Sequence, residues 1–152
     1  MKKLQFTALI QAPRALVWDT LLGPTTYRAW TAAFAEGSHF QGTWGQGQRM
    51  LFLGPGGDGM VAEIAESRPP EFLSIRHLGE IKGGVEDTES EAVRAWAPCF
   101  ENYTLAEAGG ATELTVDMDT AEAWESFMSS TWPKALALLK ALCEARAADG
   151  RA

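Results

Sequence analysis

The sequence predicts an α+β fold, with a seven-stranded curved antiparallel sheet, two short helices after the first strand and one long C-terminal helix. Apolar and polar residues alternate with a period of two through much of residues 38 to 120, as half-buried strands do. Turn signals rich in Gly and Pro separate these segments, which favours a meander of neighbouring strands. Residues 121 to 148 instead carry an apolar stripe at helical spacing.

The chain opens with one strand and two short helices. Apolar side chains fill every second position from residue 4 to residue 10, so residues 4 to 11 are predicted to form the first strand. Pro13 suits the first turn of a helix, which Gly23 and Pro24 end. The second short helix carries three aromatic side chains on one face, namely Tyr27, Trp30 and Phe34.

Six further strands make up the middle of the chain. They are predicted at residues 38–44, 48–53, 60–68, 72–79, 97–106 and 112–119. We interpret Gly54 to Gly59 as a hairpin turn, because it lacks the Lys and the following helix of a phosphate-binding loop. Residues 80 to 95 interrupt the meander with an acidic segment, where Thr88 and Glu91 predict a capping box for one short helix.

The last predicted element is a long helix at residues 121 to 148, in which Pro133 is the one strong helix breaker. Its apolar stripe consists of Trp124, Met128, Thr131, Ala135, Leu138, Leu139 and Leu142. We find no internal repeat and no linker, so residues 1–152 are predicted to form a single domain.

Composition and charge exclude several kinds of partner. The 152 residues are 46% hydrophobic and 22% charged, values typical of one globular domain. A formal net charge of −7 disfavours nucleic acid and anionic membrane surfaces. No segment approaches the roughly 18 consecutive apolar residues of a membrane helix, and no signal peptide is recognised. We expect a cytoplasmic protein without membrane insertion, as a monomer or homodimer.

The residues that commonly hold metals are scattered. Cys99 and Cys143 lie far apart and are expected to be reduced, buried thiols. His39 and His77 are also distant from one another in the sequence, so we expect no metal site. No motif for a nucleotide or another cofactor is present, and none is expected.

Several short segments resemble a known family. Tyr27 to Thr31, Trp44 to Gly47 and Phe100 to Leu105 resemble the branch named after homologues of the heat-shock-protein-90 ATPase activator. That branch belongs to the START-like, SRPBCC (birch-pollen-allergen-like) superfamily, which has the order of elements predicted above. The resemblance implies a helix-grip fold, with an internal cavity between the curved sheet and the C-terminal helix. It implies no catalytic residue, and we carry over the fold and the cavity without the co-chaperone activity.

The aromatic and methionine side chains are the candidate cavity walls. Such side chains make adaptable apolar surfaces around small ligands. The candidates are Trp30, Phe34, Trp44, Phe52, Trp124, Met128 and Trp132. The alternative is that these side chains fill a solid core.

One polar cluster is predicted on the inner face of the sheet. His77 shares the parity of Leu73 and Ile75, so its side chain is expected to point inward. Glu101 and Tyr103 share one parity on the next strand of the sheet, so the three side chains are expected to meet. They could orient a ligand, or His77 could be a buried histidine with a structural role only.

Three functions remain open from the sequence. The first is a carrier or sensor that binds a hydrophobic small molecule in the cavity. The second is an enzyme of the cyclase or hydrolase kind, in which a pocket His or carboxylate moves a proton. The third is a chaperone-related interaction module, which a filled core and an exposed apolar patch would favour.

Overall fold

The computed structural model describes residues 1 to 151, which form one antiparallel sheet and the helices that cover one face of it. The strands are β1 (Lys2–Ile10), β2 (His39–Gln41), β3 (Arg49–Leu53), β4 (Gly59–Arg68), β5 (Phe72–Lys82), β6 (Val85–Asp87), β7 (Cys99–Ala108) and β8 (Ala111–Thr120). The helices are α1 (Arg14–Leu22), α2 (Pro24–Thr31), α3 (Glu91–Arg94), the 3-10 helix η1 (Glu122–Trp124) and α4 (Glu125–Arg151).

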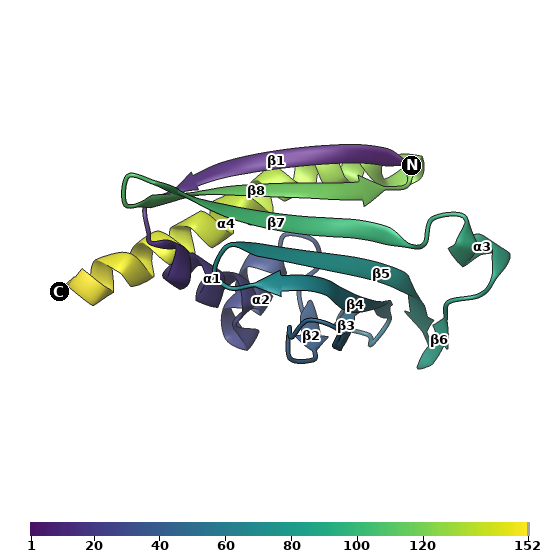
Figure 1. Cartoon of the computed structure of the whole chain (residues 1–152). Helices are drawn as coiled ribbons and strands as arrows, with labels where there is room; N and C mark the ends of the chain where they lie inside the picture. Colours follow the sequence, from purple (N-terminus) through teal and green to yellow (C-terminus); the bar gives the residue numbers. More distant parts are fainter. Residues whose placement is uncertain (152) are drawn as a thin grey trace.

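The sheet is the curved meander that the sequence predicts, closed by the N-terminal strand. Its order is β1-β8-β7-β5-β4-β3-β2, and every neighbouring pair is antiparallel. Figure 1 shows α4 crossing behind the sheet, with α1 and α2 near its C-terminal part. The α+β architecture predicted from periodicity is therefore confirmed.

The number of strands was predicted as seven, and the structure has eight. β5 continues to Lys82 instead of ending near residue 79, and it pairs with β6 inside the segment predicted to hold only a helix. Gly83 and Gly84 form the connecting turn with φ values of 58° and 78°. Two consecutive residues with positive φ match the twist of a tight hairpin, which explains the extra strand.

Three predicted boundaries also change. The short helix α3 is capped by Ser90, whose hydroxyl accepts a hydrogen bond from the Val93 N–H, and the predicted Thr88 cap is wrong. The strand predicted at residues 38–44 is shortened to β2, because Gly42 and Trp44 have positive φ values of 134° and 65°. Phe34 lies in the turn that follows α2 instead of on the helix.

The long C-terminal helix covers the inner face of the sheet, as predicted. It contacts β1, α1 and α2, and its own side chains Ala135 and Leu139 are fully buried on the side that faces the sheet. The predicted stripe is wrong at Leu138, whose side chain is 42% exposed, and at Trp124, which is 57% exposed and lies in η1 before α4 begins. In the part of the chain that the structure describes, no helix is long and apolar enough to cross a membrane.

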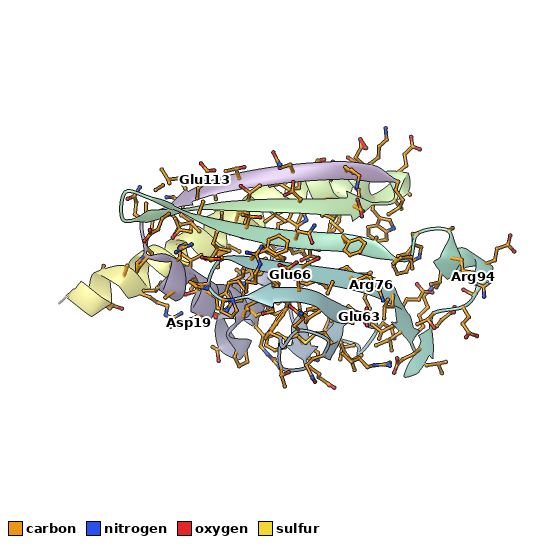
Figure 2. The ribbon with its side chains drawn as sticks, in the orientation of Figure 1. Asp19, Glu63, Glu66, Arg76, Arg94 and Glu113 are labelled. Atoms are coloured by element: carbon orange, nitrogen blue, oxygen red, sulfur yellow. The ribbon has the colours of Figure 1, made fainter. Side chains whose placement is uncertain are left out.

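The opposite face of the sheet is polar. Glu63 on β4 and Arg76 on β5 are register partners that form an ion pair there, and Figure 2 shows both beside Glu66. The alternation of polar and apolar residues therefore leaves the inner face, beneath α4, as the place for a core and a cavity.

Candidate functional site

A cavity of about 350 Å³ opens at the end of the sheet where β7 begins and β8 ends. This end lies near the N-terminus and α3 in Figure 1. Its wall includes Met60 from β4, Met118 from β8 and Met128 from α4, with Trp124 from η1 at the rim. Methionine and aromatic side chains are adaptable apolar contacts for a small ligand.

A second hollow, of about 440 Å³, lies on the outer face of β1, β8 and β7. Four of its polar side chains already pair, Lys3 with Asp119 at 2.9 Å and Gln5 with Asp117 at 2.7 Å, whereas the buried Asn102 Oδ1 has no partner. We place the candidate site in the inner cavity, although it is the smaller of the two, because it combines apolar walls with a buried polar group.

That polar group is a pair formed by His77 and Glu101. The His77 side chain is inward and only 6% exposed, and its Nε2 lies 3.2 Å from Glu101 Oε1. The Tyr103 hydroxyl donates a hydrogen bond to Glu101 Oε2. The predicted polar cluster is therefore present. His77 and Glu101 line the cavity, whereas Tyr103 lies behind Glu101.

Strand register brings these residues together. On the β5–β7 pair, His77 lies opposite Cys99 and Ile75 lies opposite Glu101, so His77 and Glu101 are diagonal neighbours on one face. Tyr103 follows two residues after Glu101 and points to the same face. An inward parity on both strands was sufficient to predict the contact.

A β-bulge adds Glu80 to the same wall. Val61 pairs with Gly79 and the next residue, Ala62, pairs with His77, so Leu78 has no partner on β4. The extra residue reverses the parity of β5, and Glu80 therefore lines the cavity although it lies three residues after His77. Simple alternation could not have found Glu80.

Burial and the negative charge of Glu101 keep the neighbouring acidic groups protonated. Burial raises the pKa of Tyr103 well above its usual value, and the Glu101 carboxylate raises it further. The same two causes, burial first, raise the pKa of the Cys99 thiol to about 12. The pKa of Tyr27 is also raised, by burial and then by Glu101.

Most of the aromatic side chains predicted to line the cavity pack against one another instead. Tyr27 contacts Trp30, Phe40, Trp44 and Phe52, with ring centroids 5.0 to 6.3 Å apart. Trp132 contacts Phe34, Trp30, Phe6 and Tyr103 in the same way. We call this group of rings the aromatic cluster. Of the predicted site residues, the cavity wall contains His77, Glu101, Trp124 and Met128.

Sequence reasoning missed several wall residues. Met60 and Met118 have the inward parity of Ala62 and Val116, which was the signal that could have identified them. Cys99 shares the parity of Glu101 and is buried as a free thiol. Within residues 1 to 151, no three His, Cys, Asp or Glu side chains lie close enough together to hold a metal ion.

Solved structures with this arrangement of strands and helices are numerous. MLL2253 from Mesorhizobium loti has a TM-score of 0.72 and 15% identity, over 93% of this chain and 96% of that one. CV1439 from Chromobacterium violaceum has a TM-score of 0.68 and 19% identity, over 93% and 96%. The fold is the helix-grip fold. At these identities the likeness concerns the fold alone.

One similar structure comes from a biosynthetic locus. DynU16, a protein of the dynemicin biosynthetic locus, has a TM-score of 0.70 and 19% identity over 95% of this chain. The match covers 48% of DynU16, so this helix-grip chain spans about half its length. No protein-family model matches the sequence, and no curated protein matches it either.

Proposed function

We propose that this helix-grip domain binds a small, largely apolar molecule in the cavity beside the N-terminal end of α4, as a carrier or a sensor. The observation that carries the proposal is the wall itself, in which Met60, Met118 and Met128 surround one buried polar pair, His77 and Glu101. Binding sites for small molecules typically combine an apolar cavity of this size with a few polar groups that orient the ligand.

The aromatic cluster supports the binding role indirectly. Trp30 donates its indole N–H to the Leu21 carbonyl at 3.1 Å, and Trp132 is 3% exposed among four other rings. The cluster lies next to the cavity, since the Phe52 ring lies 5.6 Å from the ring of His77 in the cavity wall. A rigid neighbouring core favours a preformed pocket, which reduces the ordering cost of binding.

A second candidate is an enzyme of the cyclase or hydrolase kind. The hydrogen-bonded series His77–Glu101–Tyr103 favours it, because a histidine oriented by a carboxylate can accept a proton from a bound molecule. No nucleophile is needed for that role. This activity would be shown by a compound that the unaltered protein binds and converts. The variant His77→Gln should bind the same compound without converting it.

The proposal includes three further expectations from the sequence. We propose that the chain belongs to the branch of the heat-shock-protein-90 ATPase activator homologues, that it is cytoplasmic, and that it is a monomer or a homodimer. The chaperone-related module is the least supported alternative, since it was expected to lack a cavity. Trp124 and Phe127 are exposed by 57% and 40%, which is the one observation in favour of such an interaction surface.

Native mass spectrometry of gently purified protein, with extraction of bound molecules, tests the proposed function. Titration with lipids and aromatic metabolites, followed by tryptophan fluorescence, gives affinities. Met128→Trp should narrow the cavity and weaken binding, whereas Phe127→Trp enlarges a ring one residue away, outside the cavity wall, and should not. Binding that survives Met128→Trp unchanged would mean that the cavity is not the site.

A further inference from the structure

The polar groups of the cavity wall are mainly hydrogen-bond acceptors. Three carboxylates contribute to it, from Glu80, Glu101 and Asp119. In the described part of the chain, no lysine or arginine side chain lines this cavity. Met1 also lines the cavity, and its amino group helps to lower the pKa of Asp119. A bound molecule therefore meets several acceptors, and the one cation of the wall lies on the Asp119 side.

Two of the three carboxylates already have a cationic partner. Asp119 Oδ1 lies 2.9 Å from Lys3 Nζ, and its Oδ2 accepts a hydrogen bond from the backbone N–H of Phe100. Glu80 Oε1 lies 3.5 Å from Lys82 Nζ. Both lysine side chains are largely exposed, so these pairs lie at the rim of the cavity.

Glu101 differs from both. Its side chain is 21% exposed, and its partners are an imidazole and a phenol. Neither is a permanent cation. Burial and then the nearby Glu101 carboxylate raise the pKa values of Tyr103 and Cys99. Buried charges in proteins are normally paired. Among the described residues, no lysine or arginine forms an ion pair with this carboxylate.

His77 adds a second unused acceptor. In the neutral tautomer that donates from Nε2 to Glu101, the other ring nitrogen, Nδ1, carries a lone pair. This Nδ1 is buried and has no hydrogen-bond partner. A buried acceptor of this kind costs free energy until a donor reaches it. In this tautomer His77 supplies no cation to the cavity, and Glu101, which lines it, favours a ligand that donates hydrogen bonds.

We propose that the cavity selects a protonated amine on a small apolar or aromatic body, with the ammonium paired to Glu101 and the body against the methionine walls. The inference rests on the proposed function and names its ligand class. An ammonium offers three donors and the missing positive charge, and the indole of Trp124 at the rim attracts cations. A carboxylic acid, fatty acids included, would place a second negative charge beside Glu101.

Three compounds of nearly equal size test this selection: 1-naphthylmethylamine, 1-naphthalenemethanol and 1-naphthoic acid. Calorimetric titration of the full chain at neutral pH should give the amine at least tenfold tighter binding than the alcohol, with the acid weakest. Glu101→Gln keeps the shape of the side chain and removes its charge. It should abolish the preference for the amine, so that the affinities of the amine and the alcohol then differ by no more than about twofold. Glu107→Gln, at an exposed position of the same strand, is the matched control and should change neither.

A measurement on the unaltered protein covers the case in which Glu101→Gln does not fold. Imidazole nitrogen resonances of the two histidines should respond differently to the amine, with a shift at His77 and none at His39 on β2. The inference is overturned if the acid binds as tightly as the amine, if the amine does not bind, or if its preference survives Glu101→Gln. Binding of the alcohol without an amine preference would overturn the ligand class and leave the proposed function standing.

Discussion

His77 Nε2 lies 3.2 Å from Glu101 Oε1, across the β5–β7 strand pair and on the inner face of the sheet. The pair is nearly buried, with side chains 8% and 21% exposed, and it lies where an apolar wall meets the cavity. A carboxylate in such a place depends on its donors, which makes the contact important both for stability and for ligand binding.

His77→Phe should therefore destabilise the protein by about 1 to 3 kcal/mol, because it leaves one oxygen of the Glu101 carboxylate without its donor. Urea unfolding followed by circular dichroism measures the change. His39→Phe is the control, since His39 bonds only to a local backbone carbonyl near the surface, and it should stay within about 0.5 kcal/mol of the parent. Equal losses in the two variants would show that the buried pair has no special role in stability.

Leu139→Asp should destabilise by roughly 4 kcal/mol or more, because Leu139 is fully buried under α4 and an aspartate there would be an unpaired buried charge. Leu138→Asp places the same charge one residue away, on a side chain 42% exposed, and should cost less than about 0.5 kcal/mol. Thermal melting compares them. If both variants melt alike, the face of α4 that packs on the sheet has been assigned wrongly.

Substitution of two tryptophans should separate effects on stability from effects on ligand affinity. Trp132→Ala should cost about 3 to 5 kcal/mol, since its ring packs against four others and is 3% exposed. Trp124→Ala, 57% exposed at the cavity rim, should leave the free energy of unfolding nearly unchanged and weaken ligand affinity. Denaturant unfolding and ligand titration of both variants check this. The reverse pattern would assign the ligand to the aromatic cluster.

Alkaline pH should unfold the protein. Burial raises the pKa of Cys99 from 9.0 to about 12 and that of Cys143 from 9.0 to about 11, and the pKa values of both tyrosines are also raised. Above about pH 9 the unfolded chain releases these protons while the folded chain keeps them. Rising pH therefore stabilises the unfolded state relative to the folded state. This part of the stability is complete below about pH 9 and is lost as the pH rises towards 12.

Tyrosinate absorbance and circular dichroism, recorded in one alkaline titration, measure that transition. The two signals should change together, because both tyrosines ionise only when the interior opens. Tyrosinate that forms while the circular dichroism is still native would mean that these phenols are accessible in the folded protein.

The elements that the sequence predicted correctly depend on neighbours along the chain. The alternation from Leu4 to Ile10 and along β8 predicted strands with one buried face, and the register of β1 on β8 confirms it. The glycine-rich turn between Gly54 and Gly59 predicted a hairpin, and β3 and β4 pair across it. Inward parity predicted the contact between His77 and Glu101, because parity on two paired strands is a local property of each.

The sequence by itself thus determined the fold class, the order of elements and the inner face that carries His77, since backbone periodicity and turn chemistry are local. Only the tertiary structure decided which side chains pack in the core and which line the cavity. Trp30 and Trp132 join a packed cluster while Met60 and Met118 line the cavity, and the bulge at Leu78 turns Glu80 inward. These outcomes depend on the register of distant strands and on where α2 and α4 lie over the sheet, which no pattern along one segment records.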